Sequence, residues 1–169
     1  QKKFKIIPSL VGGIFLLISI KACTPDTPVP ALTSEQCLTV NAFYEAKGEG
    51  IKGMQAVSAV VYNRVQSKMY PNSVCKVIFQ KSQFSWTHQQ SQESIRRMLE
   101  GDTRHLNRID KQAYLNAKRV SRMPQKDLQK VLPSTKVLWY HASTVSPKWC
   151  SKGIKVAQIG SHLFYIKKT

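Results

Sequence analysis

The acidic residues are the first place to look for chemistry, because this chain of 169 residues has only nine of them. One of them, Glu45, lies at the end of an apolar helical pattern that Gly48 interrupts. A second apolar helix is predicted directly afterwards, so this carboxyl group should lie half out of water where two helices meet. Burial and the negative end of a helix dipole both raise the pKa of a carboxyl group. Glu45 is therefore our candidate for a general acid.

A second carboxyl group, that of Glu49, follows four residues later. On one continuous helix the two side chains would share a face, about 6 Å apart. We expect Gly48 to turn the chain before that happens. The sequence thus favours Glu45 as the sole acid and base, with Glu49 in a structural role or positioning a substrate.

Other chemistries lack their usual residue patterns. There is no HExxH or CxxC spacing, no GxSxG or SxxK string, and no glycine-rich phosphate-binding pattern. We therefore expect neither a metal nor a cofactor. Glycosidic cleavage remains, because it needs a protonated carboxyl group at the leaving oxygen and stabilisation of an oxocarbenium-like centre. The histidines that might have formed a metal site are scattered, at His88, His105, His141 and His162.

Two later stretches carry candidates for sugar contacts, since sugar rings stack on aromatic faces. The first is a polar loop whose aromatic rings either form a sugar platform or cover the core. The second is the C-terminal part of the chain, whose rings either line a groove or pack inside. With Glu49, the candidate substrate-binding residues are Gln83, Phe84, Ser85, Trp86, Tyr140, His141, His162 and Tyr165.

The elements that must position these residues are mostly helices. A capping box of Thr33 and Gln36 begins the first helix, and the second runs from Ile51 or Lys52 to about residue 67. Asn63 and Arg64 are read as the exposed end of that second helix. Further helical segments are predicted at 73–80, 91–100, 110–122 (capped by its first residue, an aspartate) and 124–132.

The hydrophobic period changes after these helices. Residues 137–141 are typical of a strand, and 155–159 with 162–166 predict a hairpin around Gly160 and Ser161. The fold class is therefore α+β and mostly α, with a small C-terminal hairpin or sheet.

The N-terminal residues predict export. A basic start is followed by an uncharged stretch, as in a signal peptide or signal anchor at 1–22, with residues 4–20 as the possible anchor and Cys23 as a possible lipidation site. Residues 23–30 resemble a proline-rich linker, which places the catalytic domain at 31–169. We thus expect a periplasmic or extracellular protein.

The net charge of +17 implies an anionic partner. Zinc-finger spacing, basic-zipper heptads and RNA-binding aromatic motifs are missing, so we expect no nucleic acid. An anionic membrane or cell-wall polymer remains, and the protein is expected to be a monomer.

Export also makes disulfides possible. Cys37 and Cys75 both fall within the folded part, and we predict that they pair. Cys150 is then free or bonded to Cys23. The alternative is that all four cysteines are small buried hydrophobic residues.

Beyond these single features, long strings resemble the SleB-type cell-wall hydrolases, which include the spore cortex-lytic enzymes. The similar strings are Cys37 with 42–49, then 53–57, 61–65, 70–75, 83–86, 140–142, 145–147 and 159–165. The resemblance implies a lysozyme-like core and a lytic transglycosylase that cuts peptidoglycan between N-acetylmuramic acid and N-acetylglucosamine.

The family's E-A-R-G-E motif places its catalytic glutamate at Glu45, with Lys47 where arginine is usual. Such a transglycosylase needs only one carboxyl group, which acts first as acid and then as base. A muramidase, and a noncatalytic peptidoglycan-binding envelope protein on the same scaffold, are the alternatives.

Overall fold

The computed structural model describes residues 32–168. The predicted export segment, the proline-rich linker and the lipidation site at Cys23 lie outside this range and remain predictions. Between residues 32 and 168, no helix is both long enough and apolar enough to cross a membrane.

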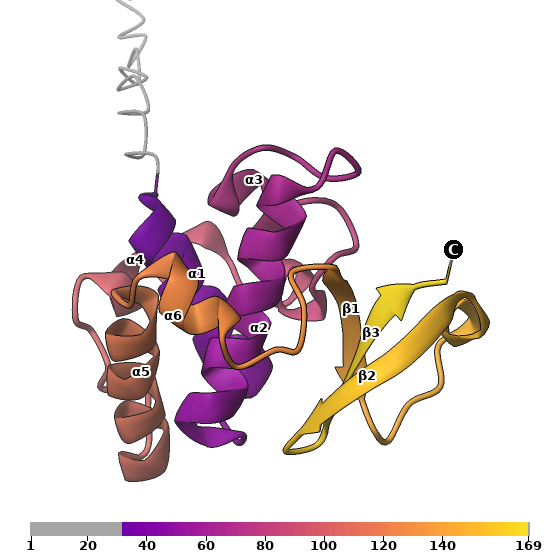
Figure 1. Ribbon diagram of the computed structural model, residues 1–169. Coiled ribbons are helices and arrows are strands. Elements are labelled where there is room, and N and C mark those ends of the chain that lie inside the picture. Colours follow the sequence, from indigo (N-terminus) through magenta and orange to yellow (C-terminus); the bar gives the residue numbers. More distant parts are fainter. Residues whose placement is uncertain (1–31, 169) are drawn as a thin grey trace, which may run out of the picture. The chain divides into compact units, whose positions relative to one another are not determined.

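Residues 32–168 form six α-helices, two short 3-10 helices and a three-stranded sheet that lies to one side of the α-helices (Figure 1). Their bounds are α1 Ser34–Ala46, α2 Gly50–Gln66, α3 Val74–Ile78, η1 Ser85–His88, α4 Gln92–Leu99, α5 Arg108–Ser121, α6 Gln125–Gln129, β1 Val137–Ala142, η2 Lys148–Lys152, β2 Gly153–Ile159 and β3 His162–Lys167. The expected mostly helical domain with a small C-terminal sheet is confirmed.

Helix α1 begins as its sequence predicts. The side chain of Thr33 accepts a hydrogen bond from the backbone N–H of Gln36, whose own side chain accepts one from the backbone N–H of Thr33. The apolar residues of this helix between positions 37 and 43 are buried in the main core. The predicted Cys37–Cys75 disulfide is present and ties α1 to α3. Cys150 makes no disulfide with any residue in 32–168.

Helix α2 lies between α5 and the sheet (Figure 1). One side of α2 contributes Met54, Val57 and Val61 to the core shared with the other helices. Its other side presents Ala56 and Ala59 to a second hydrophobic cluster that contains Phe164 of β3. Because α2 contacts both layers, it fixes the sheet relative to the helices.

The sheet has the strand order β1-β3-β2, with both pairs antiparallel. The hairpin turn falls at Gly160, which has φ 57°, and Ser161, as predicted. Tyr140 pairs with Phe164, and His141 pairs with Leu163. Because side chains alternate along a strand, Tyr140 and His141 point to opposite faces of the sheet.

Two predicted helix starts are wrong by one or two residues. Helix α5 begins at Arg108, and its cap is Asn107, whose side chain accepts a hydrogen bond from the backbone N–H of Asp110. Asp110 therefore does not cap the helix but lies in its first turn, where the helix dipole stabilises a carboxylate. Helix α2 begins at Gly50, since φ 66° at this residue allows the chain to reverse immediately after α1.

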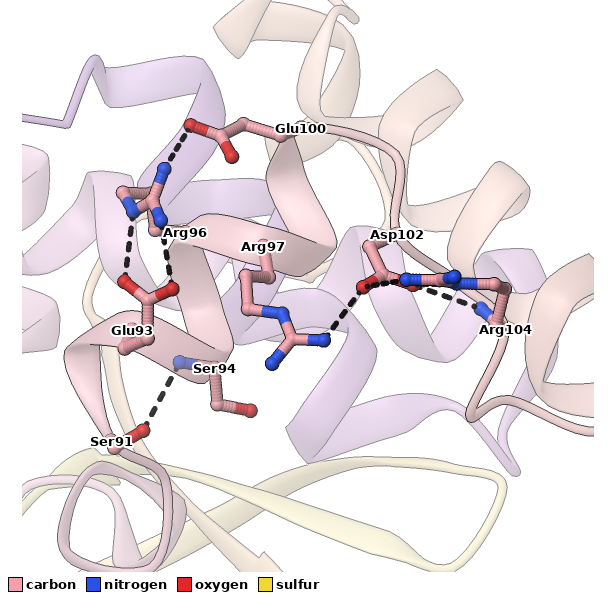
Figure 2. Close-up of polar contacts among 8 residues, drawn as sticks. All are labelled: Ser91, Glu93, Ser94, Arg96, Arg97, Glu100, Asp102 and Arg104. Atoms are coloured by element: carbon pink, nitrogen blue, oxygen red, sulfur yellow. Dashed lines mark hydrogen bonds and ion pairs between the residues drawn. The ribbon is translucent and has the colours of Figure 1, made fainter.

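Ion pairs on the surface neutralise most of the described acidic residues. Around α4, Arg96 binds Glu93 and Glu100, while Asp102 binds Arg97 and Arg104 (Figure 2). Three more pairs elsewhere are Glu35–Arg122, Asp110–Lys47 and Asp127–Lys130. Among the acidic residues of 32–168, only Glu45 and Glu49 form no ion pair.

Candidate active site

Glu45 occupies the last turn of α1 and is half-buried. Its carboxyl oxygen Oε2 accepts a hydrogen bond of 2.9 Å from the hydroxyl of Tyr140 in β1. A residue from the first helix and a residue from the first strand therefore meet, although 95 positions separate them in the chain.

The surroundings of Glu45 raise its pKa above the usual value of a glutamate. Burial is the principal cause, because a low dielectric disfavours the charged form. The hydrogen bond from Tyr140 and the positive charge of Arg64 oppose this rise in part. The carboxyl group is thus biased toward the neutral form, while two nearby groups stabilise the anion once it forms.

Arg64 corrects the expectation that the end of α2 is exposed. Its side chain is 5% exposed, and Nε donates a hydrogen bond of 2.8 Å to the carbonyl oxygen of Leu138. The guanidinium lies over the rings of Tyr70 and Phe84, 5.2 and 5.5 Å from their centroids. Its Nη1 has no hydrogen-bond partner in the described residues. A signal existed in the sequence, since position 64 continues the core stripe of Val57 and Val61.

Asn63 is buried for the same reason, because the sheet covers this end of α2. Its amide nitrogen donates to the carbonyl oxygen of Val137, and its amide oxygen accepts from the side chain of Gln129. The two polar residues therefore fasten β1 to α2 and are not a solvated helix end.

Glu49 is directed toward the hairpin turn. Its two carboxylate oxygens accept hydrogen bonds from the backbone N–H and the hydroxyl of Ser161, at 2.8 and 2.5 Å. These bonds lower the pKa of Glu49, so it remains charged. A side chain at Gly160 would collide with the same carboxylate. Glu49 thus holds the β2–β3 turn against the start of α2, the structural role that the sequence left open.

The structure divides the four candidates from the C-terminal part of the chain into two pairs. Tyr140 and His162 pack edge to face, with ring centroids 5.3 Å apart, on the sheet face that bears the Glu45 contact. Burial lowers the pKa of His162, whose Nδ1 has no hydrogen-bond partner in the described residues. His141 and Tyr165 stack at 5.2 Å on the opposite face. The expectation that all four line one groove therefore changes, because the alternation of a strand separates neighbours.

The segment 83–86 does not form an open aromatic platform. Phe84 and Trp86 are each 3% exposed and belong to the main core. The indole of Trp86 stacks on Tyr44 and donates a hydrogen bond of 3.1 Å to Asn41. Only the polar residues Gln83 and Ser85 of this segment are partly or fully exposed. Of the two interpretations of these rings, the structure favours the one in which they cover the core.

Within 32–168, no three histidine, cysteine, aspartate or glutamate side chains gather in a way that could hold a metal ion. The arrangement at Glu45 can instead donate a proton and, once ionised, accept one. What it offers chemically is a single carboxyl group with a raised pKa, a phenol donor and a nearby buried cation.

Several known proteins are similar to this chain in sequence or in fold. The chain is 28% identical to the spore cortex-lytic enzyme of Bacillus subtilis over 130 residues, which is 75% of this chain and 36% of that protein. It is 30% identical over 146 residues to the spore cortex-lytic enzyme of Oceanobacillus iheyensis, covering 83% of this chain and 45% of that one. The chain thus spans less than half the length of these curated relatives.

A solved structure, the catalytic domain of the germination-specific lytic transglycosylase SleB from Bacillus anthracis, is similar in fold. Its TM-score is 0.51 at 28% identity, over 82% of this chain and 98% of that domain. The cell wall hydrolase family model matches residues 48–165, which include the Tyr140 donor, Arg64 and the sheet up to Tyr165. By this match, the chain belongs to the cell wall hydrolase family.

Proposed function

We propose that this protein cleaves the glycan strands of peptidoglycan as a lytic transglycosylase, with Glu45 as its acid and base. The observation that carries the proposal is the half-buried carboxyl group of Glu45, which forms no ion pair and accepts a hydrogen bond from Tyr140. The same burial raises the pKa of Glu45. Membership of the cell wall hydrolase family supports the substrate class. The similar SleB domain, whose name states lytic transglycosylase activity, supports the reaction type.

In the first step, neutral Glu45 donates its proton to the glycosidic oxygen between N-acetylmuramic acid and N-acetylglucosamine. The bond from that oxygen to C1 of the muramic acid breaks, and C1 develops oxocarbenium character. The carboxylate that remains is negative beside a positive carbon, which lowers the energy of the transition state.

In the second step, the Glu45 carboxylate accepts the proton of the muramic acid 6-hydroxyl. The freed oxygen attacks C1 and closes a 1,6-anhydro ring, so Glu45 ends neutral and no water is consumed. Tyr140 and Arg64 matter most between the two steps. A hydrogen bond from a phenol and a buried positive charge both stabilise the transient carboxylate.

One carboxyl group is enough for this route, whereas an inverting hydrolase needs a second one free to activate water. The only other described acidic residue without an ion pair is Glu49, and Ser161 occupies both of its oxygens. This occupation favours transglycosylation over a muramidase reaction.

Mass spectrometry of digested peptidoglycan tests the proposal. Wild-type protein should release 1,6-anhydro products, and Glu45→Gln should lower the rate by roughly 10² or more, the scale of lost general acid–base catalysis. Reducing-end products would point to a hydrolase. No products from the wild type, with binding retained, would point to a noncatalytic peptidoglycan-binding protein.

A further inference from the structure

The face of the sheet that points away from Glu45 carries its own cluster of aromatic side chains. Trp139 pairs with Tyr165 across β1 and β3, and His141 stacks on the same Tyr165 ring. From η2, Trp149 packs against these three rings, with centroids 5.4 to 5.5 Å away. We refer to Trp139, His141, Trp149 and Tyr165 as the outer aromatic cluster.

The two tryptophans of this cluster are half-buried, so each residue keeps part of its surface exposed to solvent. The indole of Trp139 is also fixed by a hydrogen bond of 3.0 Å to the hydroxyl of Tyr70. Rigid, partly exposed rings suit the stacking of a sugar ring, because little side-chain entropy is lost when the sugar binds.

The charge around the cluster has one sign. Residues 131–168 contain no aspartate or glutamate. Lys155 pairs with Tyr165 and therefore points to the same face, and the other exposed lysines of this region are Lys136, Lys148, Lys152, Lys167 and Lys168. None of these lysines forms an ion pair with a carboxylate in 32–168. The positive charge is thus free to attract an anionic partner.

We propose that the outer aromatic cluster and its lysines form a second binding surface for an anionic glycan strand, separate from the Glu45 site. This inference rests on the proposed function for the identity of the strand, which is peptidoglycan with the carboxylates of its peptide stems. Sugar rings stack on Trp149 and Trp139, and the stem carboxylates lie near Lys152 and Lys155. Flexible lysines alone would suit any polyanion, and the rigid rings between them select a saccharide.

The surface is connected to the candidate active site through a single strand. Along β1, Tyr140 contacts Glu45 on one face, while its neighbours Trp139 and His141 belong to the outer cluster. A polymer held on the outer face therefore stays close to the Glu45 site while that site releases its product. This second contact raises the effective concentration of polymeric substrate but does not affect a fragment too short to reach both sites.

Binding is measured by co-sedimentation of the full chain with purified peptidoglycan sacculi, in a Glu45→Gln background that prevents cleavage. Trp149→Ala should weaken binding by about three- to tenfold, the scale of one aromatic contact. Trp149→Phe, which keeps a ring, should recover most of the loss. The double variant Lys152→Gln/Lys155→Gln should bind more weakly and lose less affinity when salt is added.

Lys111→Gln/Arg119→Gln is the matched control, since it removes the same charge from exposed positions on α5. It should bind almost as the parent does. Equal losses in the two double variants would overturn the proposal, because net charge alone would then explain binding. Thermal melts verify that each variant is folded.

Cleavage assays with Glu45 intact separate this surface from the catalytic one. Trp149→Ala should act normally on a short soluble tetrasaccharide but slowly on intact sacculi. Equal slowing on both substrates would contradict a second surface.

If the wild type cleaves neither substrate, the proposed function fails, and the co-sedimentation result still decides whether this face binds glycan. Duplex DNA serves as a competitor for sacculi. The face would bind polyanions in general if Trp149→Ala bound sacculi as well as the parent does and the same DNA concentration displaced both proteins.

Discussion

The hydroxyl of Tyr140 donates its hydrogen bond to a carboxyl group that must be neutral at one moment and charged at the next. This bond favours the charged form, so it opposes part of the rise in the pKa of Glu45 that burial causes. The same bond holds the carboxyl group in one orientation. Tyr140 therefore affects both the protonation state of Glu45 and its position.

Tyr140→Phe tests this double role. Without the phenol, the pKa of Glu45 should rise further, so the alkaline limb of the kcat/KM profile moves to higher pH. The rate at the optimum should fall about 10- to 100-fold, because a hydrogen bond to a charged group is worth roughly 1.5–3 kcal/mol. A pH–rate profile on soluble glycan gives both values. An unchanged alkaline limb with a lower rate would reduce Tyr140 to a packing role.

The two carboxyl groups without ion pairs should affect stability in opposite directions. Glu45 has a raised pKa in the folded state, so its own contribution to stability is most favourable below the unfolded-state pKa and is lost as pH rises through the folded-state pKa. Glu45→Gln should therefore unfold less readily than wild type at neutral pH, by on the order of 1 kcal/mol. The advantage should vanish as pH falls. Urea unfolding across pH measures the difference.

Glu49→Gln is the counterpart of that experiment. The pKa of Glu49 is lowered by the Ser161 hydrogen bonds, so its contribution is present above the unfolded-state pKa and is lost as pH falls through the folded-state pKa. This variant should be less stable than wild type at neutral pH and equal to it in acid. The same sign for both variants would refute the assigned environments.

At the scale of elements, the β2–β3 turn depends on one glycine. Gly160 has φ 57°, and a side chain there would collide with Glu49. Gly160→Ala should destabilise the fold by about 1–3 kcal/mol, as strain and collision add. Gly101→Ala is the control, since Gly101 also has positive φ, 98°, but open space around it. Chemical denaturation of both variants, with and without Glu49→Ala, separates collision from strain.

Local patterns predicted the elements well and their contacts less well. The capping box at Thr33 and the hairpin at Gly160 use interactions between residues close in sequence, and both are confirmed. The burial of Arg64 depends on β1, which begins 73 residues after it, so no local pattern shows what covers that end of α2. The expectation that Tyr140 and His141 share one groove fails for a different reason. They are neighbours in the predicted strand 137–141, so strand alternation already places them on opposite faces, and the sheet confirms this.

For the molecule as a whole, the Cys37–Cys75 disulfide spans 38 positions and joins the helix that carries Glu45 to α3. A closed loop of this length restricts the unfolded chain by an amount worth about 4 kcal/mol. Replacing both cysteines by alanine should lower the free energy of unfolding by about 3 kcal/mol, because disulfides often contribute somewhat less than the chain-entropy value. Equilibrium denaturation with and without a reductant measures it. The prediction would be contradicted if the free energy of unfolding of the wild type were the same with and without the reductant.

Glu45 of α1 and Tyr140 of β1 meet directly, and α2 packs against both of these elements. At the sheet side of α2 the residues are Ala56, Ala59 and Val60, all fully buried. The width of α2 therefore determines how closely the carboxyl group of Glu45 and the hydroxyl of Tyr140 approach each other. One added methylene beneath the sheet would push the strand outward and lengthen that contact without altering either partner. The small side chains of Ala56 and Ala59, remote from the chemistry, thus help set the length of the Glu45–Tyr140 hydrogen bond on which the proton transfer depends.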